Sequence, residues 1–247
     1  GTIYERRIST LKNWLESGEE RFTQAEKDFM IQKYKELKTP FYYEYMDGWA
    51  ALLQNISTFI LMLALVIGFL VSGIFSDEFQ TKADSIFFSA RFGRSKGISA
   101  KVGAGFCIAT GFYLMFVFLY TFIVLFILGA DGANCPIQLD LWRSVYNITF
   151  LQAYLFIVLG GYIGTIFAAT LGMLASAFTH STPTAVIVPF IVLCAFPFLS
   201  RIITLPGLCS FFPDQLLEIY LDIKEAGLIT LGSKVTTIAT VIVPVYA

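Results

Sequence analysis

Few side chains in this sequence could carry out chemistry of their own. His180 is the only histidine, which excludes a metal site with two histidine ligands and the H-E-x-x-H pattern of metalloproteases. The stretch "GRSKGISAK" lacks the G-x-x-x-x-G-K-[ST] spacing that cradles nucleotide phosphates, and the four cysteines include no C-x-x-C pair. We therefore expect no enzyme activity, no metal and no cofactor in this chain, and we interpret His180 as an exposed residue in a short turn.

A compact charged segment, residues 76–101, lies between two apolar stretches. Eight charged residues occur there: Asp77, Glu78, Lys82, Asp84, Arg91, Arg94, Lys96 and Lys101. Apolar residues recur at helical spacing among them, Ser76 or Asp77 can cap a helix, and Gly93 can end it. The pattern predicts an amphipathic helix along the membrane surface, either a connector held by acidic lipids or a docking element for a soluble partner. Its length of about 25 residues favours docking, because the turn "HSTP" connects two other segments with only a few.

The elements around this segment are those of a membrane protein. The 247 residues are 56% hydrophobic and 14% charged, with a mean hydropathy of +0.70, whereas soluble domains carry about 25% charged residues. About 20 apolar residues cross the hydrocarbon core as a helix. Runs long enough to do so, without any charge, cover residues 50–75, 102–130, 144–179 and 182–200, and a shorter run covers 235–247. The sequence predicts an all-α membrane protein, a polytopic helical bundle with four complete spans and a partial fifth.

Residues 1–48 differ in composition, because they hold about half of the charged residues of the chain. Thr23 and Glu26 form a capping-box pattern at the start of a predicted helix, and Pro40 ends that helix. We predict a small helical hairpin in water, followed by an aromatic belt at the membrane surface that includes Tyr43 and Trp49. Basic residues are not gathered on an aromatic-studded face, so nucleic acid is not an expected partner.

The predicted spans place residues 1–48, 131–143 and 201–234 on one side of the membrane and 76–101 on the other. The five Lys and Arg residues of 76–101 favour the cytoplasm for that loop, so residues 1–48 are expected to be extracytoplasmic in a multi-pass protein of the cell membrane. Cys135 and Cys209 then share the extracytoplasmic side. They form either a disulfide or two unpaired thiols.

Two further patterns concern helix packing. Small residues recur every four positions at Gly160, Gly164, Ala168 and Gly172, which predicts close packing within the chain or against another subunit. Residues 205–226 are too polar to cross the membrane and too apolar for a free loop. We predict a re-entrant or interface helix from Pro213 to Glu225, with leucines on one side and Asp214, Glu218, Asp222 and Glu225 largely on the other.

The run "FSDEFQTKADSIFFSARFGRSKGISAK" resembles the first cytoplasmic loop of type-2 ATP-binding-cassette (ABC) transporter permeases. The residues at matching positions are Glu78, Thr81, Ser89, Arg91, Gly93, Arg94 and Lys101. The preceding "TPFYYEYMDGWAALL" resembles the end of the large extracytoplasmic loop of Gram-positive members. By this resemblance the chain lacks the first of six spans and is truncated in the last.

The resemblance implies a permease subunit that pairs with a second permease subunit in the lipid bilayer. A separate ABC ATPase subunit, which holds ATP and Mg²⁺, would dock on residues 76–101, with Glu78, Thr81, Arg91 and Arg94 as the coupling residues. The substrate would be hydrophobic or amphipathic, and the transporter an exporter. Two alternatives stay open: an ion-coupled carrier or channel, and a membrane-anchored sensor or assembly protein. The predicted spans contain no ionisable side chain of the kind that ion-coupled carriers use.

Overall fold

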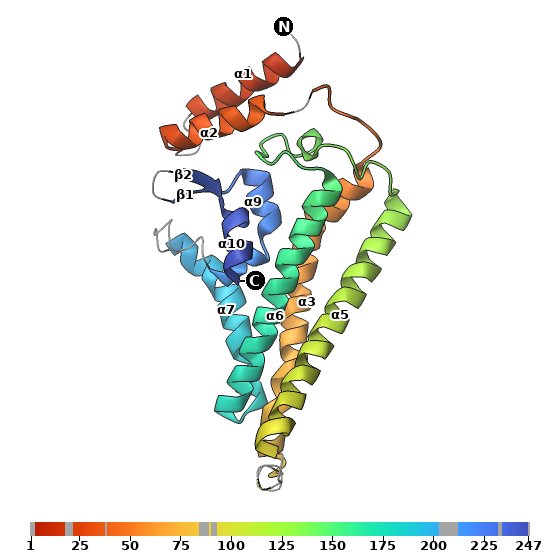
Figure 1. The fold of residues 1–247 in the computed structure, drawn as a ribbon, viewed down its shortest axis with the longest axis vertical. Helices are drawn as coiled ribbons and strands as arrows, with labels where there is room; N and C mark the ends of the chain where they lie inside the picture. The colour runs from red at the N-terminus through yellow and green to blue at the C-terminus, as the bar shows by residue number, and fades with distance from the viewer. Residues whose placement is uncertain are drawn as a thin grey trace.

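The structure is a computed structural model that describes residues 3–17, 22–37, 39–83, 89, 93–202, 212–231 and 234–246. The elements follow in the order α1 (Ile3–Glu16), α2 (Gln24–Lys35), α3 (Asp47–Gln80), η1 (Gly93–Gly97), α5 (Ile98–Leu128), η2 (Ile137–Leu139), α6 (Phe150–Thr179), α7 (Thr182–Ile202), η3 (Pro213–Leu216), α9 (Ile219–Glu225), β1 (Leu228–Leu231), β2 (Lys234–Thr237) and α10 (Ile238–Tyr246). Figure 1 shows the long helices along one axis, with α1 and α2 across one end. We call that end the hairpin end, and the opposite one, where α3 ends and α5 begins, the loop end.

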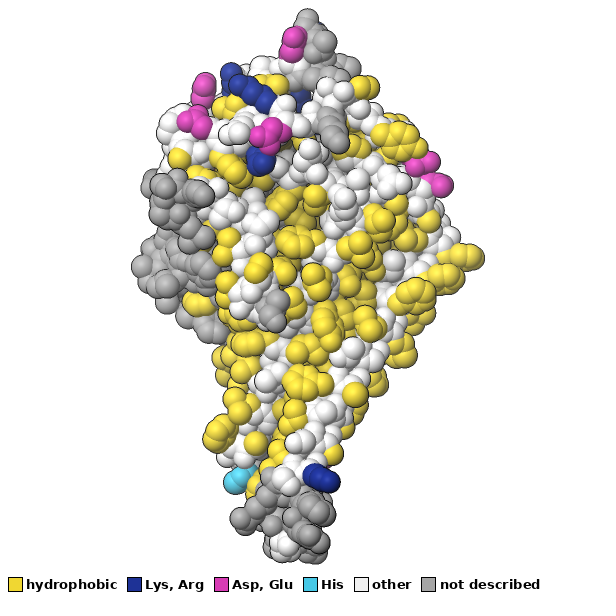
Figure 2. Space-filling view, in the orientation of Figure 1, with side chains coloured by type: hydrophobic (Ala, Val, Ile, Leu, Met, Phe, Trp, Pro, Cys, Tyr) yellow, Lys and Arg dark blue, Asp and Glu magenta, His cyan; other side chains and the backbone are white. Residues whose placement is uncertain are grey.

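Three helices in the described ranges are long and apolar enough to cross a membrane: Asp47–Gln80, Ser95–Leu128 and Phe150–Thr179. Hydrophobic side chains cover the surface along them, and charged ones lie toward the two ends (Figure 2). By length and composition this is a membrane-embedded, mostly helical protein, as predicted. The described apolar part of α7, Thr182–Cys194, is shorter, so the count of four complete spans stays a prediction.

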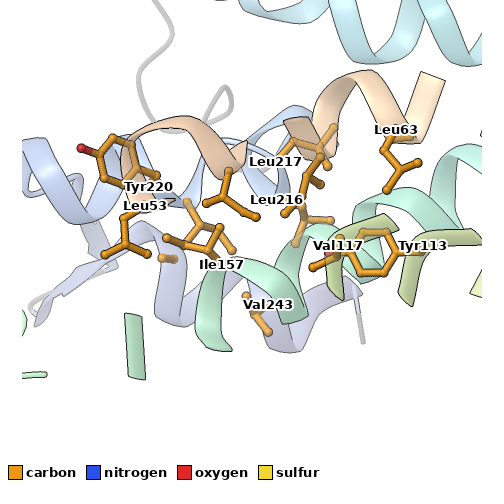
Figure 3. Close-up of a cluster of buried hydrophobic side chains, with 14 of the residues drawn as sticks. Leu53, Leu63, Tyr113, Val117, Ile157, Leu216, Leu217, Tyr220 and Val243 are labelled. Atoms are coloured by element: carbon orange, nitrogen blue, oxygen red, sulfur yellow. The ribbon is translucent and has the colours of Figure 1, made fainter. Parts of the chain in front are cut away.

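The core forms around α3, which packs against α5, α6 and α7. Ile56, Ile60, Leu63 and Ile67 are buried at intervals of three and four residues, which places them on one face of that helix. Side chains from α5, α6 and the η3–α9 segment complete the cluster (Figure 3). A fully buried tyrosine, Tyr113, donates from its hydroxyl to the backbone oxygen of Val158 at 2.7 Å, which joins α5 to α6 inside the core.

Polar caps, more than the ends of apolar runs, set the helix boundaries at the hairpin end. The run predicted to span from residue 144 becomes helical only at Phe150, because Thr149 and Gln152 form a capping box. The predicted capping box of Thr23 and Glu26 is present at the start of α2. Helices α1 and α2 pack together through a small cluster that also contacts Val145 and Ala226, so they cover the hairpin end of the bundle.

The C-terminal part corrects three expectations. The continuous helix predicted from Pro213 to Glu225 is wrong, because η3 and α9 are separate pieces. Residues 228–231 and 234–237 form an antiparallel β-hairpin that an all-α prediction omits. Val235, where the last apolar run was expected to begin a span, lies in β2, and α10 starts three residues later. The β-branched residues Val235, Thr236 and Thr237 favour this extended conformation.

Candidate functional site

The loop end of α3 differs from the expected start of a new helix. Ser76 and Asp77 were predicted to cap a second helix, but α3 continues through them without interruption to Gln80. Thr81 then ends it: its backbone N–H donates to the carbonyl oxygen of Asp77 at 2.9 Å, and its hydroxyl donates to the same oxygen at 2.7 Å. Lys82 follows with a φ of +55°, which turns the chain away from the helix axis. Charged side chains alone therefore did not end this helix.

A polar cluster joins this end of α3 to the turn between α6 and α7. We call it the loop-end junction; it consists of Ser76, Asp77, Gln80, Ser176 and Thr182. The Ser76 backbone N–H donates to the Ser176 hydroxyl at 2.8 Å, and the Ser76 and Thr182 hydroxyls lie 2.6 Å apart. Thr182 donates to Asp77 Oδ1 at 3.2 Å, and Gln80 Nε2 donates to the Thr182 hydroxyl at 3.1 Å. Ser76 and Ser176 are fully buried, whereas Asp77 and Gln80 are exposed, so the hydrogen bonds that join the three helices run from the core to the surface.

An ion pair fastens the start of α5 to the same end of α3. Lys101 Nζ lies 2.5 Å from Glu78 Oε1, and both side chains are about one-fifth exposed. The same ammonium group donates to the backbone oxygen of Ile74 at 2.8 Å and lies 5.5 Å from the centre of the Phe75 ring. The residues that enter and leave the segment 76–101 are therefore in direct contact, so a force on this segment acts on α3 and α5 together.

His180 lies at the edge of this region. It ends α6 with a φ of +52°, and its exposed imidazole stacks on Phe79 with ring centres 3.7 Å apart. The expectation of an exposed turn residue is confirmed, and the stacking is an additional contact between α3 and the α6–α7 turn. Glu78, Thr81 and His180 thus come together at one end of the bundle.

The structure describes little of the other two predicted coupling residues, Arg91 and Arg94. The position of Arg91 is outside the described ranges, and of Arg94 the structure describes only the backbone, in the π-helix η1. This π-helix runs directly into α5, so the expected break at Gly93 becomes the start of a helical segment. Residues 84–88 and 90–92, about half of the predicted amphipathic helix, also lie outside the described part of the chain.

The small residues of α6 face two different neighbours. A β-carbon at Gly160 or Gly164 would press on side chains of the η3–α9 segment, namely Ile219 and Leu217. A β-carbon at Gly172 would lie 3.1 Å from the backbone oxygen of Gly68 in α3, and Ala168 between them is fully buried. These residues therefore allow close approach within one chain.

Of the two loop cysteines, Cys135 and Cys209, the structure describes only Cys135. Cys135 is fully buried as a free thiol, and its sulfur lies 3.9 Å from the backbone oxygen of Glu44. Cys209 lies outside the described residues, so their pairing stays a prediction.

A pocket and two buried carboxyl groups, which the sequence did not predict, lie toward the hairpin end. A pocket of about 410 Å³ opens between the first half of α3, α7 and the η3–α9 segment. Asp214 and Asp222, predicted on the side of one helix opposite its leucines, are only 2% and 8% exposed, whereas Leu221 is 41% exposed. Burial raises the pKa of Asp214, and burial together with Glu218, Glu225 and Asp214 raises the pKa of Asp222 to about 7.

The chain matches no protein-family model, no curated protein and no solved structure. The geometry of the loop-end junction and of the pocket therefore carries the functional argument.

Proposed function

We propose that this protein is the permease subunit of an ATP-driven ABC transporter, with residues 76–101 as the docking segment for a separate ATPase subunit. On this proposal the loop end is cytoplasmic and the hairpin end extracytoplasmic, and the protein exports a hydrophobic or amphipathic substrate. ATP and Mg²⁺ would bind to the partner, since the sequence has no phosphate-binding loop.

The loop-end junction and the ion pair Glu78–Lys101 carry this proposal. Glu78, near the start of segment 76–101, contacts Lys101 at its end. The end of α3 that carries Glu78 also forms hydrogen bonds with Thr182 of α7. A soluble partner that moves the segment would therefore move α3, α5 and α7 together, which is what energy coupling through a loop requires. A connector anchored only by lipids needs no such bonding between three helices.

The apolar surface of α5 supports the partner expected within the bilayer. The buried residues of this helix form one narrow stripe, Gly105, Ala109, Tyr113 and Val117, at intervals of four. Large apolar side chains elsewhere on α5, such as Phe118 and Phe126, are 73% and 80% exposed. Lipid or a second permease subunit would cover this face.

The experiment is co-purification of the full-length protein from its native membranes in mild detergent. We expect an ATPase with a phosphate-binding loop to co-purify with the unaltered protein. Glu78→Lys should release it, because like charges would then face each other at positions 78 and 101. Glu78→Lys combined with Lys101→Glu restores opposite charges at the two positions. Recovery of the ATPase in this double variant would show that the contact between α3 and α5 is the requirement, and continued loss would show that Glu78 touches the partner itself.

A matched control is Asp131→Lys, which makes the same change of charge at an exposed position at the hairpin end. It should retain the ATPase. Absence of any ATPase from the unaltered protein, at low detergent and in native membranes, would refute the proposal.

Buried carboxyl groups favour a second candidate, an ion-coupled carrier. The predicted spans lack Asp, Glu, Lys, Arg and His, but Asp214 and Asp222 supply two carboxyl groups buried against them. A carrier of this kind would move substrate in sealed vesicles under a proton or sodium gradient, without ATP and without a partner. Transport that requires ATP and the co-purified ATPase would exclude it.

A further inference from the structure

The pocket at the hairpin end has mostly apolar walls and one buried acidic group. Leu61 and Leu193 line it from α3 and α7, and Leu217 lines it from the η3–α9 segment. Its volume of about 410 Å³ lies in the range of pockets that hold small organic molecules, roughly 300–1,000 Å³. An apolar molecule or an apolar tail therefore fits the walls.

The acidic group is Asp214, which is 2% exposed and lines the same pocket. Its Oδ2 accepts a hydrogen bond from Gln215 Nε2 at 3.3 Å. Its Oδ1 has no hydrogen-bond partner among the residues that the structure describes. A buried carboxylate with an unsatisfied oxygen is costly, and the raised pKa of Asp214 reflects that cost. A bound donor with positive charge would remove it.

The charges around the pocket favour a cation over an anion. Glu218 also lines it, and Lys224 is the basic residue at its rim, so acidic groups outnumber basic ones among the described lining residues. From α3, Gln54 and Ser57 contribute neutral polar groups, and the Ser57 hydroxyl has no partner within the described ranges. A metal ion is a poor match, because no cluster of three or more His, Cys, Asp or Glu side chains suited to a metal occurs in the described part of the chain.

We propose that this pocket binds an amphipathic amine, with its ammonium group against the Asp214 carboxylate and its apolar tail against Leu61, Leu193 and Leu217. The site would select for positive charge through Asp214 and for an alkyl or aromatic tail through the leucines. The inference concerns binding to this chain alone and does not depend on an ATPase partner.

Cys194 provides a direct readout, because this half-buried free thiol lines the same pocket. The experiment follows alkylation of Cys194 by N-ethylmaleimide, measured by peptide mass spectrometry, in full-length protein in phosphatidylcholine nanodiscs at pH 7.5. The probe is dodecylamine, which is an ammonium ion at this pH. Dodecanol and dodecanoate have the same tail with a neutral or a negative head, so they separate tail binding from charge recognition.

We expect dodecylamine to slow the labelling of Cys194 at concentrations at least about tenfold below those of dodecanol and dodecanoate, since hydrogen bonds to charged groups contribute about that much selectivity. Asp214→Asn, which keeps the shape of the side chain, should abolish the difference between the amine and the alcohol. Asp131→Asn, at an exposed site outside the pocket, should leave it unchanged.

Equal protection of Cys194 by the amine and the alcohol in the unaltered protein would overturn the proposal, and so would stronger protection by dodecanoate. Cys194 that does not react even without amine would mean that another protein segment fills the pocket, which also overturns it. Because the comparison of the three amphiphiles needs no variant, the test remains decisive even if Asp214→Asn does not fold.

Discussion

Replacing Asp222 with asparagine should make the stability of this protein less sensitive to alkaline pH. Asp222 lies in α9 with 8% exposure, and its Oδ2 has no hydrogen-bond partner among the described residues. Its pKa rises from 3.8 to about 7, mainly because of burial and to a lesser extent because of the neighbouring Glu218, Glu225 and Asp214. The folded protein therefore binds a proton at Asp222 more tightly than the unfolded chain does.

This difference sets the sign and the size of the effect. The stability that comes with the bound proton is fully present below pH 3.8, and it is lost as the pH rises through 3.8 to about 7. The whole loss amounts to roughly 4 kcal/mol at about 1.36 kcal/mol per pH unit, and roughly 2 kcal/mol of it falls between pH 5.5 and pH 8. Asp222→Asn has no charge to bury, so it should escape this loss.

The assay is thermal unfolding in detergent micelles, followed by tryptophan fluorescence, at pH 5.5 and pH 8. The stability of Asp222→Asn relative to the unaltered protein should increase between the two pH values by about 4–8 °C in Tm, since 1 kcal/mol corresponds to about 2–4 °C for a protein of this size. Asp131→Asn should show no such change, because its side chain is exposed. A difference in Tm that is independent of pH would refute the reasoning. A difference that shrinks toward pH 8 would mean that Asp222 is charged and favourably paired.

Two further predictions concern contacts within the bundle, and both are measured by the same thermal unfolding. Gly48→Ala should lower Tm by several degrees, because its β-carbon would collide with the backbone oxygen of Gly129. Gly103→Ala is the control and should leave Tm unchanged, because its β-carbon meets nothing within 4 Å. Equal Tm values for the two variants would contradict this packing. Tyr113→Phe should cost about 1 kcal/mol, because the hydroxyl that donates to Val158 at 2.7 Å is lost inside the core; an unchanged Tm would mean that this bond contributes nothing.

The long helices could be predicted from the sequence because length and apolarity alone decide which segments enter a membrane. The apolar runs at 50–75, 102–130 and 144–179 each correspond to one long helix. Their ends were less predictable, since a helix continues through charged residues until the backbone must turn. Asp77 and Glu78 looked like the first turn of a new helix, but the turn comes only at Lys82, with its positive φ.

The polar sites were harder to predict, because they depend on residues distant in sequence. Ser76 bonds to Ser176, a hundred residues away, and neither position stands out in the sequence among other serines. At Asp214 and Asp222 the amphipathic pattern was interpreted as an acidic side of one helix, opposite its leucines. Instead, α3, α6, α7 and α10 all contact the η3–α9 segment, so residues on both sides of the short helix are buried. Periodicity shows which residues share a face, but it does not show how many faces are covered.

The pocket and the loop-end junction involve the same two helices. Ser57 and Leu193 line the pocket from α3 and α7, and Ser76 and Thr182 join these helices at the loop end. Along α3 the two sites are 19 residues apart, a distance of about 28 Å at the rise of an α-helix.

Between the two sites, the helices meet at a close contact. A β-carbon at Gly68 of α3 would lie 3.6 Å from the Pro189 ring of α7, and one at Gly172 of α6 would lie 3.1 Å from the Gly68 backbone oxygen. Gly68 and Pro189 are therefore in van der Waals range, which makes this contact a natural pivot between α3 and α7. If α3 and α7 move as units about this pivot, a tilt that opens the hydrogen bonds of Thr182 at one end also changes the space between Ser57 and Leu193 at the other. An amine bound at Asp214 and a soluble protein bound to residues 76–101 would therefore act on one shared coordinate, the angle between α3 and α7.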